Sequence, residues 1–240
     1  YGTWEMFDHN VPYGQGTSDS GLCDLMRRQK PSFWFYKSQS EKAPYVKLVA
    51  DWQPGKATRR VVVFTNCDVA SISVNGHSLG QKRSSATGTS TTYEKAKPFD
   101  GSNTVNLMHP PIIFDDVPYR GGALTVLAVR GKEQATDIIK TAGPADHLKI
   151  WVDDLGYPVG RNDLVFIRAA VVDKDGVICP TDSRAIGFTV TGAAFAGESS
   201  VQCEMGVASV LIRTPLGKTR IKVEAISKGV PLAKSEFAIN

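Results

Sequence analysis

Two carboxylates near the start of the chain have the neighbours that a sugar-cleaving site would use. Glu5 and Asp8 lie beside the aromatic residues Trp4 and Phe7. Retaining glycosidases hold two carboxyl groups about 5–5.5 Å apart, so the pair is a candidate. On an extended strand, however, residues three apart point to opposite faces. We therefore expect Glu5 and Asp8 to be structural groups and not a catalytic pair, and no catalytic residue is assigned.

Other groups of acidic residues favour turns over metal sites. The run DKDG at residues 173–176 resembles the opening of a calcium loop, but the later ligands and the closing Glu are missing. An Asp-Gly pair between two apolar runs is typical of a hairpin turn. Asp153, Asp154 and Asp163 favour a solvated loop over a cation site. We expect no metal and no cofactor.

Histidines and cysteines show no spacing that predicts catalysis or zinc binding. No nucleophile stands at motif spacing from any of the four histidines, which are His9, His77, His109 and His147. The four cysteines are far apart, without a C-x-x-C pair; they are Cys23, Cys67, Cys179 and Cys203. Two interpretations stay open for Cys179 and Cys203: a disulfide across a sandwich, or small buried apolar residues.

Composition narrows the class of protein. The chain has 240 residues, a formal net charge of +4, 42% hydrophobic residues and 22% charged residues, as in a globular protein. The basic residues form no long cluster, so we do not expect nucleic acid as a partner. No apolar run approaches the ~20 residues that span a bilayer, so no membrane span is predicted.

The elements predict a mainly β chain of three parts. Residues 1–43 combine an aromatic-rich strand, a loop and a helix that begins near Pro31. Residues 44–143 and 144–240 each contain short strands of high β-propensity separated by turn signals, which predicts two immunoglobulin-like β-sandwiches. Asn75-Gly76 is a strong hairpin signal. The predicted inward-facing residues are Val61, Val63, Ile72 and Val74 in the first sandwich, and Ile221 and Val223 in the second.

Three motifs, in order along the chain, resemble the C-terminal part of family 2 glycoside hydrolases, the β-galactosidase and β-glucuronidase family. GTWEMFDHN and GLCDLMRRQKPSFWFYKSQ, at residues 2–10 and 21–39, resemble the last strand and helix of the family's (β/α)8 barrel. TNCDVASISVNGHSLGQK, at residues 65–82, and GGALTVLAVRGKEQATDIIKTAG, at residues 121–143, resemble the sandwich that follows the barrel. Residues 145–240 resemble the invasin-like sandwich that ends many bacterial members.

The resemblance implies a fold and a role for the segment. The two sandwiches would follow a strand-loop-helix remnant of a TIM barrel. Both catalytic glutamates of the family lie on earlier barrel strands, so this chain alone is predicted to be inactive. Trp4 would form the aromatic floor of the sugar subsite, and Asp8 would lie on the same rim.

The resemblance also implies partners. These are the rest of the glycosidase barrel and the carbohydrate substrate of the parent protein, and a homo-oligomer stays open. It implies a bacterial parent that is periplasmic or secreted. The alternative function is a stand-alone carbohydrate-binding or adhesion module, although such a module has no use for the aromatic first block.

Overall fold

The computed structural model describes residues 5–10, 16–85, 107–154 and 156–239. It consists mainly of strands, and the chain divides into two compact units, Tyr1–Thr141 and Ala142–Asn240. Each unit contains a two-sheet sandwich, so the predicted mainly β fold class is confirmed. The finer division of the first unit into a barrel segment at residues 1–43 and a sandwich from residue 44 stays a prediction.

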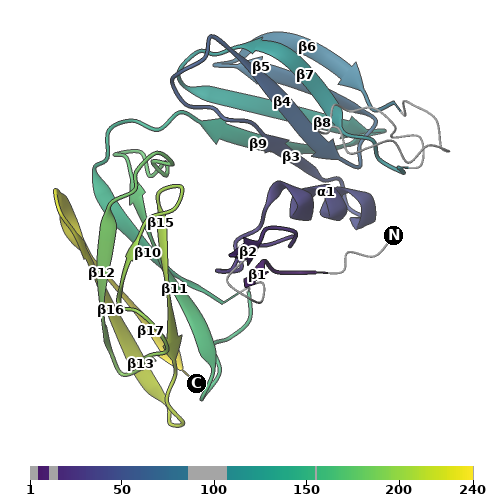
Figure 1. Cartoon of the computed structure of the whole chain (residues 1–240). Coiled ribbons are helices and arrows are strands. Elements are labelled where there is room, and N and C mark those ends of the chain that lie inside the picture. The colour runs from purple at the N-terminus through teal and green to yellow at the C-terminus, as the bar shows by residue number, and fades with distance from the viewer. Residues whose placement is uncertain (1–4, 11–15, 86–106, 155, 240) are drawn as a thin grey trace. The chain divides into compact units, whose positions relative to one another are not determined.

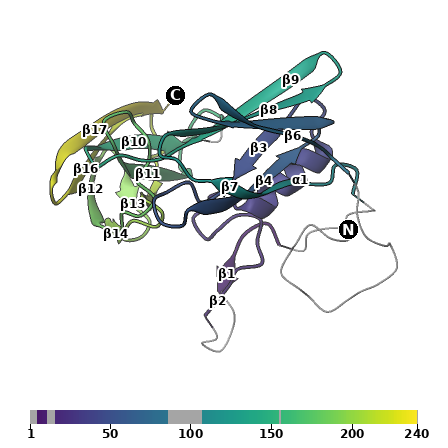
Figure 2. The ribbon, with the colours of Figure 1, turned by 90° about the horizontal axis from the view of Figure 1, so that it is seen from above.

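The first unit opens with a small hairpin and a helix and continues into sandwich 1. The hairpin pairs β1 (His9–Asn10) with β2 (Thr17–Ser18), and α1 spans Pro31–Ser40. One sheet of sandwich 1 has the order β3-β4-β7, with β3 Val46–Val49, β4 Thr58–Thr65 and β7 Ile112–Pro118. The other has the order β6-β5-β8-β9, with β5 Val69–Val74, β6 His77–Arg83, β8 Ala123–Arg130 and β9 Glu133–Lys140. Figures 1 and 2 both show α1 beside β3 and β4.

Alternation of apolar and polar residues builds the core of sandwich 1. Along β5, the side chains of Ile72 and Val74 are 1% and 2% exposed, while the intervening serines are only half-buried. Val61 and Val63 on the facing sheet are fully buried. Asn75 and Gly76 have φ angles of +50° and +81° and join β5 to β6. The four predicted core residues and the predicted hairpin turn are therefore confirmed.

The second unit forms sandwich 2. Its first sheet has the order β10-β11-β15-β13, with β10 His147–Asp153, β11 Leu164–Val172, β13 Ala194–Phe195 and β15 Val207–Arg213. Its second has the order β14-β12-β16-β17, with β12 Ala185–Thr191, β14 Ser200–Gln202, β16 Thr219–Ser227 and β17 Val230–Ile239. Ile221 and Val223 are 0% and 1% exposed, as predicted.

The DKDG run forms a hairpin turn, as predicted. Asp173 is 3% exposed. Its Oδ1 accepts hydrogen bonds from the backbone N–H groups of Asp175 and Val177, both at 2.9 Å, and its Oδ2 accepts one from Gly143 at 2.7 Å. Because this carboxylate pairs with backbone groups, it serves the turn and not a calcium ion.

All four cysteines are buried and none of them forms a disulfide, so the apolar interpretation of Cys179 and Cys203 is confirmed. Cys179 and Cys203 both belong to the core of sandwich 2. Burial, with a smaller contribution from Asp173, raises the pKa of the Cys179 thiol. A buried thiol with a raised pKa is a weak nucleophile.

Core packing in sandwich 1 predicts a clear difference between the two faces of β5. Ile72 is fully packed, and Ile72→Ala would leave a cavity in the core. This substitution should therefore lower the free energy of unfolding by about 2–4 kcal/mol. Ser71→Ala on the opposite face should change it by less than about 0.5 kcal/mol. Denaturant unfolding of the chain measures both, and equal effects would contradict the assigned core.

An ion pair in sandwich 2 predicts a dependence of stability on pH. Hydrogen bonds from the guanidinium of Arg184, at 2.8 and 2.7 Å, lower the pKa of the Asp182 carboxyl. The ionised carboxylate therefore stabilises the folded state, and this contribution disappears as the pH falls below about 4.

Asp182→Asn should reduce the protection of core amides in unit 2 by about 1 kcal/mol at pH 7. The difference from the wild type should shrink progressively as the pH falls below about 4. Hydrogen exchange measures the difference, with the exposed turn variant Asp175→Asn as the control. A loss that persists unchanged at low pH would contradict the ion-pair explanation.

Candidate functional site

The predicted sugar-facing residues lie in the first block, whose described part centres on a small sheet. Trp4 lies outside the described residues, and its role stays a prediction. The backbone near Asp8 pairs in parallel with that near Cys23: Asp8 N–H donates to Cys23 O at 2.9 Å, and Cys23 N–H donates to Met6 O at 2.9 Å. Cys23 also pairs with Gln29 in an antiparallel bridge.

Gly21 allows these segments to approach closely. A Cβ atom at this position would lie far inside contact distance of the backbone of Phe7 and Asp8. Glycine is therefore required here by space, and its φ does not lie in the left-handed region. The glycine of the GLCD motif lets the strand of residues 5–10 pack against the segment that leads to α1.

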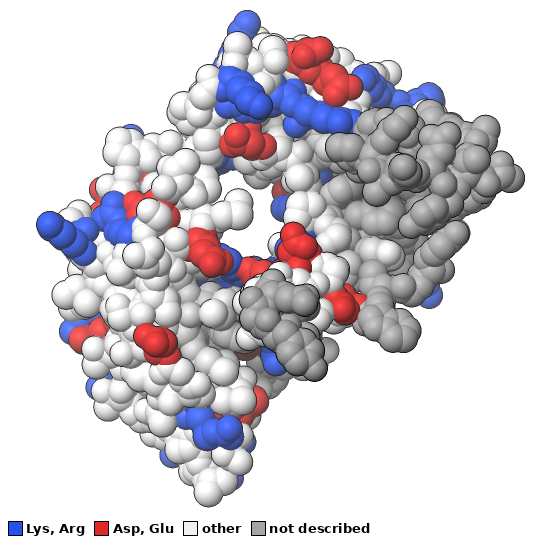
Figure 3. Space-filling model, in the orientation of Figure 1, with Lys and Arg blue, Asp and Glu red and all other residues white. Residues whose placement is uncertain are grey.

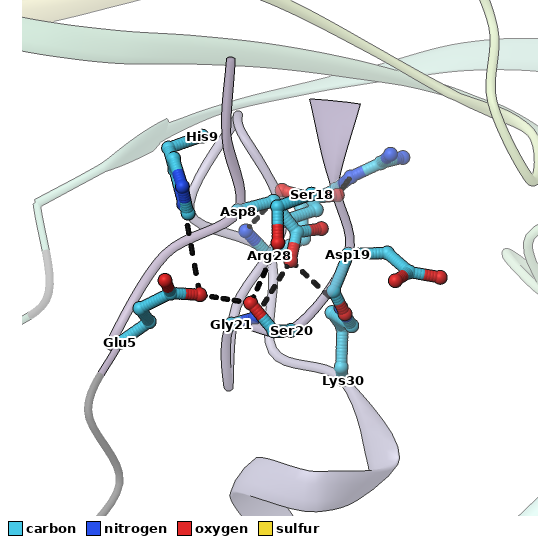
Figure 4. Close-up of polar contacts among 10 residues, drawn as sticks. Glu5, Asp8, His9, Ser18, Asp19, Ser20, Gly21, Arg28 and Lys30 are labelled. Atoms are coloured by element: carbon cyan, nitrogen blue, oxygen red, sulfur yellow. Dashed lines mark hydrogen bonds and ion pairs between the residues drawn. The ribbon is translucent and has the colours of Figure 1, made fainter. Parts of the chain in front are cut away.

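Asp8 is turned into the block (Figure 4). Its Oδ1 accepts hydrogen bonds from Gly21 N–H at 2.9 Å and from Lys30 Nζ at 2.8 Å. The side chain is 11% exposed. Its carboxylate ties the strand to the residue that precedes α1, and the predicted contact of Asp8 with sugar stays untested.

Glu5 takes different partners. Its Oε2 accepts a hydrogen bond from Ser20 Oγ and lies 3.6 Å from His9 Nδ1 (Figure 4). Asp8 contacts Lys30 and Gly21, whereas Glu5 contacts Ser20 and His9, so the two carboxylates have no partner in common. The expectation that they are not a catalytic pair stays a prediction.

Helix α1 is anchored to sandwich 1 by aromatic and polar contacts. The rings of Phe35 and Phe64 meet edge to face, with centroids 5.8 Å apart. Lys47 Nζ lies 5.2 Å from the centroid of the Trp34 ring and 3.1 Å from Asp137 Oδ2. Aromatic side chains of the helix therefore pack against β3 and β4, and an ion pair lies at the border of this contact.

The amides of Gln39 and Asn66 secure the same junction, and sequence reasoning assigned no role to either. Gln39 Nε2 donates to the carbonyl oxygen of His109 at 2.7 Å, and Gln39 Oε1 accepts the backbone N–H of His109 at 3.0 Å. Asn66 donates to the carbonyls of Glu41 and Ala43 at 2.8 and 2.7 Å. The signal was present in the sequence, because both residues belong to motifs that resemble the family: KSQ and TNCD.

Tyr45 also lies at this junction. Its hydroxyl is buried without a hydrogen-bond partner in the described structure. Burial, reinforced by the nearby Asp137 and Glu41, raises the pKa of Tyr45 to about 12.

The three aspartates considered for a cation do not form a site. The expectation of a solvated loop is wrong for Asp153, which is the last residue of β10. Its carboxylate accepts a 2.9 Å hydrogen bond from Nε of the buried Arg168. Asp154 and Asp163 accept backbone N–H groups within their turns. Across the described ranges, no three His, Cys, Asp or Glu side chains are placed to hold a metal ion.

The first block also exposes large apolar side chains. Their exposed fractions range from 37% to 52%, and they are Met6, Phe7, Leu25, Met26 and Tyr36. Figure 3 shows both acidic and basic side chains on the described surface, with basic side chains gathered along its upper edge. The described helix is too short and too polar to cross a bilayer.

Two family models match the chain in adjoining regions. Residues 148–236 match the glycoside hydrolase family 2 C-terminal domain 5, and residues 55–135 match a domain of unknown function, DUF4982. The chain corresponds to the C-terminal part of a family 2 glycoside hydrolase. The structure fits this assignment, with a hairpin and a helix followed along the chain by two sandwiches.

Curated relatives and solved structures agree with the family models. The chain is 24% identical to a beta-galactosidase of Thermoanaerobacter pseudethanolicus over 98% of its length, and 26% identical to a beta-galactosidase of Bacteroides ovatus over 80%. It spans only 31% and 21% of those proteins. A beta-glycosidase structure from Bacteroides vulgatus has a TM-score of 0.76 at 22% identity, over 99% of this chain and 30% of the other. A family 2 member from Bacteroides cellulosilyticus has a TM-score of 0.76 at 18% identity, over 99% of this chain and 35% of the other.

The close approach at Gly21 predicts a local effect of a single methyl group. Gly21→Ala should separate the paired segments, because the obstructing atoms are backbone and cannot rotate away. Hydrogen exchange at Asp8 and Cys23 should then accelerate by about tenfold or more. Core amides of sandwich 1 should keep their protection, and Gly121→Ala, where no atom lies closer than 4.0 Å, is the control. Unchanged exchange at Asp8 would contradict the packing.

Proposed function

We propose that this chain completes a retaining β-galactosidase-type glycoside hydrolase and supplies no catalytic carboxylate to it. The parent would cleave terminal β-glycosides through two glutamates on barrel strands outside this segment. The exposed apolar side chains of the first block carry the proposal. Because these five side chains are already about half-buried, completing their burial would contribute roughly 0.5–1.5 kcal/mol each. The remainder of a barrel is the cover that such a block fits.

Trp4 is the proposed contact with substrate in this segment. An aromatic ring can stack on the apolar C–H face of a galactose-like ring, and active sites of (β/α)8 barrels lie at the carboxyl ends of their strands. Asp8 would act at this site mainly by holding the strand, since its carboxylate pairs with Lys30.

The relatives favour a β-galactoside as the substrate. Two of them are beta-galactosidases, and a third is a beta-glucuronidase of Formosa agariphila. The two beta-galactosidases are 24% and 26% identical to this chain, and the beta-glucuronidase is 23% identical. We therefore propose a β-galactoside as the substrate in preference to a β-glucuronide.

The test compares this chain with the longer protein that contains it. The chain alone should not hydrolyse a chromogenic β-galactoside, because it lacks both the nucleophile and the acid/base group. The longer protein should turn it over and should prefer it to the matching β-glucuronide. Hydrolysis by the chain alone that is lost in Glu5→Gln or Asp8→Asn would overturn the proposal.

A second experiment addresses the aromatic floor. In the longer protein, Trp4→Ala should lower kcat/KM by about tenfold or more, since it removes a contact with the sugar. Trp151→Ala, on β10 of the second unit, is the matched control and should leave kcat/KM within about twofold. Equal effects of the two variants would contradict the role of Trp4.

A further inference from the structure

Asn66 forms a complete hydrogen-bonding hub directly after β4. It is 2% exposed, and its Nδ2 donates to the carbonyls of Glu41 and Ala43 while its Oδ1 accepts Tyr45 N–H at 2.8 Å. These three partners belong to the segment that leaves α1 and enters β3. One side chain of sandwich 1 therefore defines the path of the chain at the end of the helix.

Gln39 adds a second attachment on the last turn of α1. Its amide oxygen and nitrogen both bond to the backbone of His109, just before β7. Two bonds to one residue fix an orientation as well as a distance. Together with the contact between Phe35 and Phe64, this attachment fixes the rotation of α1 on sandwich 1.

The other end of α1 holds the strand of residues 5–10. Lys30 immediately precedes the helix, and its Nζ reaches both Asp8 Oδ1 at 2.8 Å and Asp19 O at 2.5 Å. Its backbone N–H donates to Leu22 O at 3.0 Å. A helix of ten residues is a rod of about 15 Å. Polar contacts at both ends make it a rigid link between sandwich 1 and the strand.

We infer that sandwich 1, most of which matches a domain of unknown function, positions the sugar-facing strand of the first block through α1. Asn66 and Gln39 are its positioning residues, and Lys30 transmits the position to Asp8. The effect of this positioning on catalysis rests on the proposed function. The coupling itself is a property of this chain and can be measured without activity.

Hydrogen exchange of the chain tests the coupling. Asn66→Asp and Gln39→Glu keep the size of each side chain but replace an N–H donor with an oxygen that faces a carbonyl. Each should accelerate exchange at the amides of Asp8, Gly21 and Cys23 by about fivefold or more, although none of these residues contacts the altered side chain.

The matched control is Asn75→Asp. Asn75 also bridges a carbonyl and an N–H, at Gly121 and Ala123, but at a hairpin of sandwich 1 away from α1. It should leave exchange in the first block unchanged. Acceleration in all three variants, or in none while circular dichroism shows them folded, would overturn the inference. If Asn66→Asp does not fold, Gln39→Glu decides alone.

Kinetics of the longer protein give a second readout. Lys30→Met removes the link to Asp8 while keeping most of the stem, and it should raise KM for a chromogenic β-galactoside about fivefold with kcat within about twofold. Gln39→Glu should shift KM in the same direction. Equal losses in kcat and KM, or an unchanged KM, would contradict positioning.

The proposed function and the coupling through α1 can be overturned separately. A wild-type longer protein without β-glycosidase activity would overturn the proposed function, and the exchange data would then decide the coupling. An active enzyme whose first block exchanges identically in Asn66→Asp and the wild type would overturn the coupling and leave the proposed function standing.

Discussion

The exit of helix α1 into sandwich 1 is the constraint on which the first unit depends. The chain turns there beside a dry core, so its backbone N–H and C=O groups must find partners inside the protein. Thr65 and Asn66, which are 0% and 2% exposed, supply them: Thr65 Oγ1 donates to Tyr45 O at 2.6 Å, and Asn66 bonds to three more backbone groups. A residue without both donors and acceptors would leave at least one of these groups unpaired.

The parts of the chain differ in how they are stabilised. Each sandwich buries its own apolar cluster between two sheets, which is sufficient for an independent core. The first block instead relies on short-range polar contacts and on the packing of α1 against sandwich 1.

Much of the fold was predictable because its signals are local. Alternation in VASISV and the Asn75-Gly76 turn act over a few residues, and Ile72 and Val74 lie where the pattern put them. The partners of Asp8 were not predictable in the same way. Lys30 is 22 residues away, and nothing in the spacing of the two indicates that they meet. Asp153 likewise looked like a loop residue because its partner, Arg168, lies on another strand.

The sequence by itself determined the mainly β class, the two sandwiches, their core faces and the family resemblance, since periodicity and turn chemistry are encoded over short stretches. Only the tertiary structure decided that Glu5 and Asp8 have separate partners, that Cys179 and Cys203 form no disulfide, and that Gln39 and Asn66 hold α1. These outcomes depend on which distant segments approach to about 3 Å. A hydrogen bond is lost when its two atoms move apart by less than about 1 Å, whereas a hydrophobic pattern predicts only which face of a strand is buried.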